Sequence, residues 1–358
     1  MRMRTSAVVA RVRAAAIIAM LVLASWVVAA APAQARQITD SAGRVVEIPE
    51  RIDKVFASGP PASILVYALK PEALLGWPRA LREIEKPYIA APYRELPETG
   101  RLTGRGGGAN VERVLAMRPD LILDFGSVRD TYIDLADRVQ AQTGIPTLLV
   151  DGRFENTAAA LRLVGDALGV TERAQALAAD VEQTLRELDH MLASVPAAAR
   201  PRVYLARGPD GLETGLKGSI NAEIIERAGG RNVAEAPGRH GLVRASPEQL
   251  IVADPDTIIT WDRRFFESVA HDPIWQGISA VRNDRVYLSP TAPFGWIDRP
   301  PSVNRIMGLK WLAGVFYPDR WPHDLRESTR AFYRLWYQVD PSEAELKTLL
   351  QWANGRAP

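Results

Sequence analysis

The sequence predicts an α/β protein with two Rossmann-like lobes, one long connecting helix and a ligand cleft between the lobes. Short apolar runs alternate with segments of helical length, which is typical of parallel βα units. One helix–turn–strand pattern also occurs twice, before and after a long helical stretch. At 358 residues the chain is long enough for two cores, because single cores rarely extend beyond about 250 to 300 residues.

The N-terminal segment, residues 1–35, has the pattern of a secretory signal peptide. Several arginines precede an apolar run at 14–30, and the small residues Ala33 and Ala35 form a cleavage pattern. We expect the mature protein to begin near Arg36 and to be exported to the periplasm. An uncleaved anchor is the alternative, but the apolar run is shorter than the ~20 residues that a spanning helix needs. The sequence has no cysteine, which excludes disulfides and a lipid-bearing cysteine.

The remaining chain divides into lobes around a stretch rich in alanine and leucine. This stretch is interrupted only near Gly165 and Gly169, so it predicts the connecting helix. The predicted divisions are an N-terminal α/β lobe (36–152), the connecting helix (153–197), a C-terminal α/β lobe (198–320) and a helical tail (321–358). The strand candidates are 55–58, 73–77, 120–124 and 147–150 in the first lobe, and 202–206, 257–261 and 285–289 in the second.

An internal repeat relates NVERVLAMRPDLILD (110–124) to SPEQLIVADPDTIIT (246–260). In each copy a helix-capping residue opens a short helix, a glutamate (Glu112 or Glu248) lies in its first turn, and a Pro-Asp pair leads into a strand. The repeat indicates that the two lobes share one plan. The alternative is a chance match, because α/β proteins use few helix–turn–strand arrangements.

Arginine and aromatic residues recur at the predicted ends of strands. In doubly wound sheets the carboxyl ends of strands face the ligand crevice, so we expect these side chains to line the cleft. Arginine binds anionic groups through its forked donors, and tryptophan covers apolar ligand surface. Taken singly, each such residue is more often a packing residue or a solvated charge. The candidates are Trp77, Arg79, Arg129, Arg207, Trp261, Arg263, Arg264, Phe294, Trp296, Asp298 and Arg299, with His240 in a loop that also suits a cleft position.

A glycine-rich segment at 103–109 contains Arg105 and leads directly into the first repeat helix. Backbone N–H groups in such a segment suit an anionic group, and Arg105 joins the candidate ligand contacts. A dinucleotide site is one alternative, but the segment does not follow a clear strand. A flexible connector, in which the glycines only permit the turn, is the other.

Several function classes lack their signatures. The net charge is +2 and no dense basic run appears, so no nucleic-acid partner is expected. No nucleophile elbow or phosphate loop is present, and the four histidines are too scattered to form a helical metal pair. We therefore expect no catalysis, cofactor or metal site. A periplasmic enzyme that uses the cleft remains the alternative from another class.

From about Ile38 to Trp321 the chain resembles the class III periplasmic substrate-binding proteins of ABC importers, the iron-siderophore and cobalamin type. The resemblance rests on residues 40–57, 104–123, 161–174 and 219–234, and on the second repeat unit. It implies two lobes joined by a rigid helix, without enzymatic activity. It also implies that Glu112 and Glu248 dock against arginines of a permease in the inner membrane. As an alternative, first-turn glutamates stabilise the helix dipole by ~0.3 to 1 kcal/mol, and Ser246 and Gln249 suit a capping box.

The resemblance leaves the ligand open. Residues 293–314 resemble members that handle metal complexes, which favours an iron-siderophore or similar metal chelate. Molybdate or tungstate, cobalamin and heme are the alternatives. The arginines of the predicted cleft favour a small anionic ligand. We expect the protein to act as a monomer.

Overall fold

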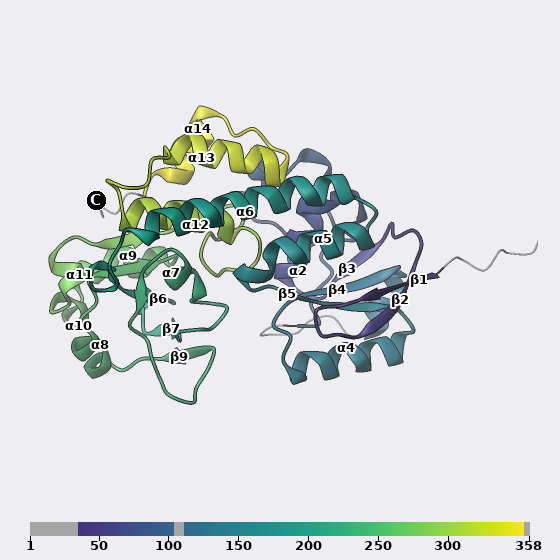
Figure 1. The fold of residues 1–358 in the computed structure, drawn as a ribbon, viewed down its shortest axis with the longest axis horizontal. Coiled ribbons are helices and arrows are strands. Elements are labelled where there is room, and N and C mark those ends of the chain that lie inside the picture. The colour runs from purple at the N-terminus through teal and green to yellow at the C-terminus, as the bar shows by residue number, and fades with distance from the viewer. Residues whose placement is uncertain (1–34, 104–110, 354–358) are drawn as a thin grey trace, which may run out of the picture.

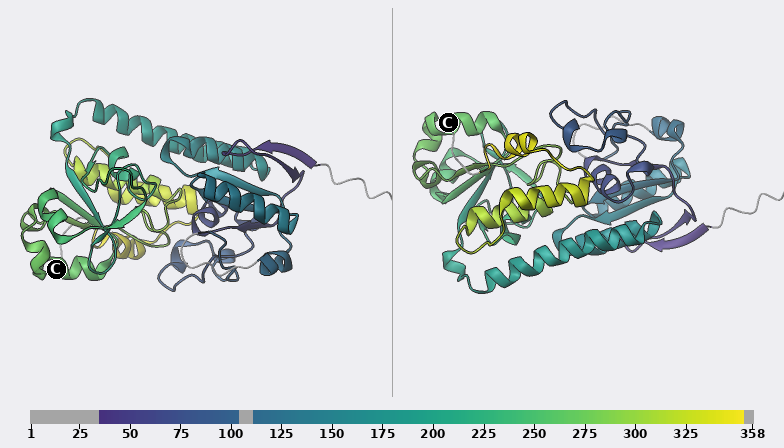
Figure 2. Two further views of the ribbon diagram at one scale, coloured as in Figure 1. Left: turned by 90° about the horizontal axis from the view of Figure 1, so that it is seen from below. Right: turned by 90° about the horizontal axis from the view of Figure 1, so that it is seen from above.

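The computed structural model describes residues 35–103 and 111–353. Two lobes lie side by side, and the long helix α6 runs across both of them (Figures 1 and 2). Each lobe is built on a parallel sheet. Residues 1–34 of the predicted signal peptide and residues 104–109 of the glycine-rich segment, with Arg105, lie outside the described residues. Within the described ranges, no helix is both long and apolar enough to cross a membrane.

The first lobe contains a three-stranded sheet in the order β3-β4-β5. All residues of β4 from Leu121 to Phe125 are buried, as expected for a central strand covered on both faces. A two-stranded antiparallel ribbon, β1-β2, precedes this sheet. The elements are β1 (Ala35–Thr39), β2 (Val45–Pro49), β3 (Val55–Ala57), α2 (Pro60–Leu69), α3 (Val111–Met117), β4 (Leu121–Gly126), α4 (Asp130–Thr143) and β5 (Thr147–Asp151).

The strand expected at 73–77 is not formed. Its residues follow a short 3-10 turn, η1 (Pro71–Ala73), and make only isolated bridges, from Leu74 to Val55 and from Trp77 to Glu98. Pro71 and Pro78 bracket the segment, and proline cannot donate to a strand ladder. Two further 3-10 turns, η2 (Lys86–Tyr88) and η3 (Ala91–Tyr93), follow it.

The predicted connecting stretch forms two helices. After the turn η4 (Phe154–Asn156), helix α5 (Thr157–Ala167) ends before Gly169, whose φ of +69° favours glycine. Helix α6 (Thr171–Ala193) then crosses to the second lobe (Figure 1). Gly165 is a packing residue, since a Cβ there would lie 2.1 Å from the Ala174 Cβ. The crossing helix is therefore α6 alone.

The second lobe contains a parallel sheet in the order β11-β10-β6-β8 and a small antiparallel ribbon, β7-β9. Every residue of β10 is buried, like the equivalent strand β4. The elements are η5 (Ala197–Ala199), β6 (Arg202–Ala206), β7 (Glu213–Gly215), α7 (Glu223–Arg227), β8 (Arg231–Asn232), β9 (Leu242–Arg244), α8 (Pro247–Ala253), β10 (Thr257–Thr260), α9 (Arg263–Ser268), η6 (Val269–His271), α10 (Pro273–Gln276), α11 (Ser279–Arg282) and β11 (Val286–Leu288).

The C-terminal region packs against both lobes. The Tyr67 hydroxyl donates to the Tyr337 carbonyl (2.7 Å) and the Tyr88 hydroxyl to the Glu345 carbonyl (2.9 Å), which ties this region to the first lobe. Trp352 packs against Phe266 of the second lobe. The expected helical tail is thus integrated into the core. The elements of this C-terminal region are α12 (Arg305–Phe316), α13 (Leu325–Phe332), the π-helical turn η7 (Tyr333–Tyr337) and α14 (Glu343–Leu350).

The two repeat units have the same local structure. Helices α3 and α8 precede the central strands β4 and β10, and each helix is followed by a residue with positive φ, Arg118 at 48° and Asp254 at 29°. The carboxylates of Asp120 and Asp256 then accept backbone N–H bonds at the start of the neighbouring strand. The capping box expected at the start of α8 is also present.

Candidate ligand-binding site

The strand ends of the two lobes meet through Arg305 at the start of α12. Its guanidinium is buried and donates to the Gly152 carbonyl after β5 (2.6 Å) and to the Ile220 carbonyl before α7 (2.8 Å). It also forms an ion pair with Glu223 (2.8 Å). Because Gly152 belongs to the first lobe and Ile220 to the second, Arg305 joins the lobes at the edge where ligand-contacting residues were expected.

A connected polar group forms the second lobe's side of this edge. The buried Asp298 carboxylate lies 2.8 Å from Arg207 Nε, an ion pair without the alignment of a hydrogen bond. It accepts hydrogen bonds from Trp261 Nε1 (2.7 Å) and Asn221 Nδ2 (3.3 Å). Burial raises the pKa of Asp298, while Arg207 and the donor groups oppose that rise. This carboxylate fixes the position of the Trp261 ring.

Arg299 extends this group toward the first lobe. Its guanidinium carbon lies 4.5 Å from the centre of the Trp261 ring, a cation–π arrangement. Burial, together with repulsion from Arg82 and Arg79, lowers the pKa of Arg299 despite the attraction of Asp262 and Asp298. The Arg299 backbone carbonyl accepts from the Gly295 N–H (3.0 Å), but the structure shows no hydrogen bond or ion pair of the Arg299 guanidinium within residues 35–103 and 111–353.

The first lobe supplies Arg79 and Arg82, which share the buried carboxylate of Glu85. Arg79 donates to both of its oxygens, at 2.8 and 2.7 Å, and Arg82 Nε donates at 2.8 Å. Burial would raise the pKa of Glu85, but these hydrogen bonds outweigh it and hold the pKa below its ordinary value. We call Arg79, Arg82, Arg207, Trp261, Asp298 and Arg299 the inter-lobe cluster.

A second polar group lies where β3 and β4 end. Ser58 Oγ donates to the buried Asp124 carboxylate at 2.6 Å, and Thr103 Oγ1 lies 3.3 Å from the same oxygen. Burial raises the pKa of Asp124, and these two hydroxyl groups partly counter it. The backbone N–H of Thr103 also donates to the Ser58 carbonyl, so this group anchors the residue directly before the glycine-rich segment.

Five of the residues expected at the cleft belong to the inter-lobe cluster: Arg79, Arg207, Trp261, Asp298 and Arg299. The structure places three aromatic candidates in the core instead. Trp296 is fully buried and packs against Trp311, while Trp77 packs between Tyr67 and Phe294. The expectation that Trp77, Phe294 and Trp296 line the ligand site is therefore corrected, because their large apolar area is used in packing.

Three other candidates are exposed, and among the described residues none of them forms a hydrogen bond, ion pair or ring contact with a residue of the cluster. Arg263 is the first residue of α9 after the capping Asp262, and its side chain pairs with Glu267 and covers the Trp352 ring. Arg129 caps α4 and donates to Ser127, and His240 is exposed in the loop before β9. The turn at Asp262 directs the Arg263 side chain toward Trp352 of the C-terminal region.

Sequence reasoning missed Arg82 and Asn221, whereas it placed Asp298 and Arg299 at the cleft as part of the motif PFGWIDRP. A usable signal for Arg82 was the spacing of Arg79, Arg82 and Glu85, which lets one acid bind both arginines. Of the motif PFGWIDRP, Asp298 and Arg299 contact Trp261, while Phe294 and Trp296 are buried in the core. No local pattern indicates Asn221.

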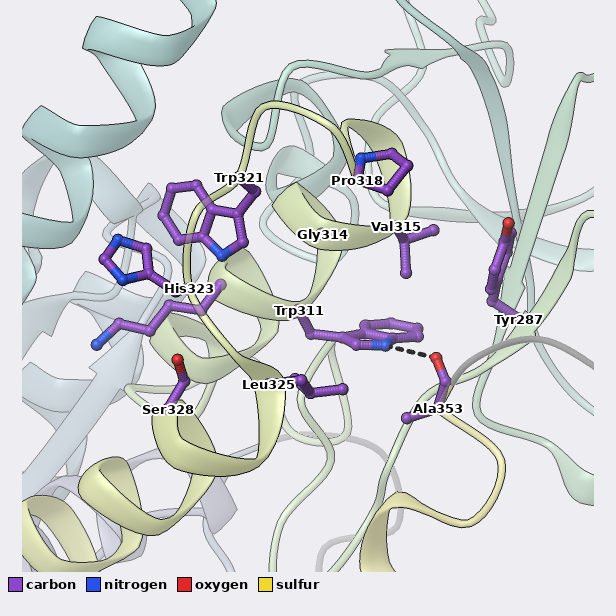
Figure 3. A pocket seen from close by; sticks show the side chains of 11 residues that line it. Tyr287, Trp311, Gly314, Val315, Pro318, Trp321, His323, Leu325, Ser328 and Ala353 are labelled. Atoms are coloured by element: carbon purple, nitrogen blue, oxygen red, sulfur yellow. Dashed lines mark hydrogen bonds between the residues drawn. The ribbon is translucent and has the colours of Figure 1, made fainter.

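A separate recess of about 340 Å³ lies beside α12 and the C-terminal region (Figure 3). Trp311 and Trp321 line it, and Trp311 Nε1 donates to the Ala353 carbonyl. Its charged groups are already paired, Lys310 with Asp180 and His323 with Glu187. The inter-lobe cluster is thus the better candidate site for an anionic ligand. Among the residues that the structure describes, no group of three or more His, Asp or Glu side chains could hold a metal ion.

Comparison with known proteins places this chain among transport-related binding proteins. A substrate-binding lipoprotein of an ABC transporter from Bacillus subtilis, itself uncharacterized, is 26% identical over 59% of this chain and 66% of its own. A cobalamin-binding protein of Halobacterium salinarum is 31% identical over 55% of this chain and 49% of its own. The chain therefore spans only about half to two thirds of these curated relatives.

Solved structures extend the similarity over most of the chain. An ABC transporter solute-binding protein from Sulfurospirillum deleyianum is 32% identical, with a TM-score of 0.80, over 88% of this chain and 99% of its own. The molybdate-binding protein MolA of Haemophilus influenzae shares the fold, with 23% identity and a TM-score of 0.71 over 86% of this chain and 99% of its own. These neighbours confirm the predicted two-lobed α/β fold. The sequence profile described as "Periplasmic binding protein" matches residues 67–293, and the chain belongs to that family.

Proposed function

We propose that this protein is the substrate-binding component of an ABC importer, and that it carries a small anionic ligand between its lobes. Within that class we favour an iron-siderophore or a similar metal chelate that bears negative charge. The observation that carries the proposal is the Arg299 guanidinium, which lies 4.5 Å from the centre of the Trp261 ring without a side-chain hydrogen bond or ion pair among the described residues. Burial and the positive charges of Arg82 and Arg79 lower the pKa of Arg299, and an anion bound beside it would oppose that repulsion.

The cluster also favours one class of ligand over its rivals. Arg299 and Arg207 lie over the Trp261 ring, at 4.5 and 5.5 Å from its centre, so cations and aromatic surface occur together, which suits a ligand that combines anionic groups with apolar or aromatic surface. Ferric siderophores and anionic heme have both properties, and molybdate and tungstate have the charge alone. A neutral corrinoid would leave the cations uncompensated. The role is binding, without catalysis, in keeping with the relatives named above.

Export and delivery complete the proposal. The segment 1–35 would direct the chain to the periplasm, where the mature protein would act as a monomer. Glu112 and Glu248, exposed in the first turns of α3 and α8, would contact the permease at the inner membrane. Replacing both with lysine should abolish uptake and leave ligand affinity unchanged. A large loss of affinity would place them in the ligand site instead.

The test of the ligand class begins with native mass spectrometry of protein purified from its own periplasm, which would reveal a carried ligand. Calorimetry on protein stripped of ligand then compares ferric catecholate and hydroxamate siderophores, molybdate, tungstate, heme and cobalamin. Charge-assisted hydrogen bonds are worth ~1.5 to 3 kcal/mol, so Arg299→Ala should weaken binding about ten- to a hundred-fold.

Arg263→Ala is the matched control, because it removes an exposed arginine of the same lobe that pairs elsewhere. It should leave affinity within about twofold. Tight binding of cobalamin alone, equal in wild type and Arg299→Ala, would show that the ligand is neutral and that the cluster does not contact it.

A further inference from the structure

Large apolar side chains are exposed on the two repeat helices. Among the described residues, five large apolar side chains are exposed, and three of them belong to α3 and α8. Leu115 on α3 is 43% exposed, while Ile251 and Val252 on α8 are 60% and 84% exposed. Single exposed apolar residues are ordinary on a protein surface. Their concentration on two helices that are equivalent by the internal repeat needs a reason.

Leu115 and Ile251 occupy the same position in the two repeat units. The seven residues of α3 and the seven of α8 follow one order of exposure, in which only the fourth residue, Val114 or Leu250, is buried. Leu115 and Ile251 each come directly after that buried anchor. Each also follows an exposed glutamate, Glu112 or Glu248, by three residues. Residues three apart are neighbours on a helix surface, so each lobe presents an acid beside an apolar side chain.

The topology places both pairs on the side of the sheets where the lobes meet. Each helix leads directly into the central strand of its lobe, α3 into β4 and α8 into β10. Because such a helix runs back against its strand, its first turn lies near the carboxyl ends of the strands. The two acid–apolar pairs therefore belong to the same edge of the two lobes, one pair on each.

We propose that Leu115 and Ile251 are a matched pair of apolar docking contacts for the permease. Each would enter an apolar depression that has a cationic group beside it, which Glu112 or Glu248 would meet. The same acid–apolar pair occurs on each lobe. The partner surface must therefore have two copies of the matching depression. A membrane protein with two equivalent subunits has that property. Val252 enlarges the contact on the second lobe.

This inference rests on the proposed importer function, and the experiment separates the two. The permease encoded with this protein is reconstituted in lipid nanodiscs, and binding of wild type, Leu115→Ser, Ile251→Ser and the double variant is measured by interferometry. The proposal assigns both side chains to the minority of interface residues whose truncation costs about tenfold or more in Kd. We expect about that loss for each single variant and a larger loss for the double variant.

The chain offers matched controls in Val45 and Ile84, which are 63% and 60% exposed and lie outside the repeat helices. Val45→Ser and Ile84→Ser should bind the permease like wild type. Thermal unfolding checks that every variant folds, and Leu115→Gln and Ile251→Gln retain helix propensity if serine disturbs the short helices.

A second measurement uses the absence of native cysteine. Leu115→Cys and Ile251→Cys each allow a single environment-sensitive fluorophore, whose emission should shift to the blue when the permease is added. The same label at Ile84→Cys should not respond.

The possible outcomes distinguish a wrong importer function from a wrong assignment of the apolar contacts. If wild type does not bind the permease, the importer function itself is wrong. A second outcome is that wild type binds the permease, the double variant Glu112→Lys with Glu248→Lys does not, and both serine variants bind like wild type. The glutamates would then be docking contacts, and the proposed apolar contacts would be wrong. A loss from only one of the two serine variants would overturn the matched pair. If sedimentation shows wild-type dimers that the double variant dissociates, the surface serves a second copy of this chain and the inference is also overturned.

Discussion

The two lobes supply arginines to the inter-lobe cluster in different states. Arg207 of the second lobe is only 12% exposed and is neutralised by Asp298 and Glu213. Arg79 of the first lobe is 56% exposed and shares the one carboxylate of Glu85 with Arg82. Arg207 thus stabilises the cluster through its two acidic partners, while Arg79, Arg82 and Arg299 retain N–H donors that a ligand could use. An arginine's role here depends on its acidic partners more than on its position at a strand end.

The largest effect should come from removing the carboxylate on the neutralised side. Asp298→Ala takes away the partner of Arg207 and the acceptor for Trp261 and Asn221. Removing one member of a buried ion pair costs about 3 to 5 kcal/mol. Urea denaturation should show a loss of that size in the free energy of unfolding. Asp298→Asn, which keeps an acceptor, should lose less, and equal stability of both variants with wild type would contradict the assignment.

A smaller and different effect is expected on the exposed side. Glu85→Gln keeps the shape of the side chain but removes the charge shared by Arg79 and Arg82. The free energy of unfolding should fall by roughly 1 to 3 kcal/mol, as for weakened hydrogen bonds to a buried acid. Affinity for an anionic ligand should rise at low ionic strength, because the cations lose their internal partner. Calorimetry at two salt concentrations measures this, and lower affinity would mean that Glu85 mainly positions the arginines.

The pH dependence of stability gives a third comparison. The folded-state pKa of Glu85 lies below its ordinary value, so the carboxylate stabilises the fold above the unfolded-state pKa of about 4.3. That contribution is lost as the pH falls through the lower, folded-state pKa. The stability difference between wild type and Glu85→Gln should therefore be constant near neutral pH and shrink below about pH 4. Denaturation curves at several pH values check this, and a gap that widens in acid would contradict it.

The smallest effect is expected for Arg129, which also follows a strand of the first lobe. It is exposed, and its hydrogen bond is to the hydroxyl of Ser127. Arg129→Ala should change stability by less than about 0.5 kcal/mol and ligand affinity by less than about twofold. A tenfold loss of affinity would show that Arg129 contacts the ligand. The distinction between arginines inside and outside the inter-lobe cluster would then be wrong.

The fold was predictable because its signals are local. The apolar run at 120–124 and its repeat at 256–260 identify the central strands, and Gly169 marks the end of α5. The segment 73–77 was misread because an apolar run between prolines resembles a strand, although it is a buried connection. Local pattern thus identifies elements, and proline placement decides whether they join a ladder.

The site was less predictable because it depends on where side chains point. Trp296 and Arg299 are three residues apart, yet one is in the core and the other is exposed beside Trp261. The arginines whose charges add to burial in lowering the pKa of Arg299 are Arg82 and Arg79, more than two hundred positions earlier. Only the packing of the two lobes and the C-terminal region brings these residues together. No periodic pattern in the sequence predicts that packing.

The attachment of the C-terminal region to both lobes has a mechanical consequence. With α6 alone as the link, the lobes would be free to twist about one axis. The bonds from Tyr67 and Tyr88 to residues 337 and 345, and the contact of Trp352 with Phe266, add a second brace across the same gap. Two braces resist twisting far better than one. We therefore expect the relative orientation of the two lobes to change little in the free protein. Release of a bound ligand would then require a partner that pushes the lobes apart.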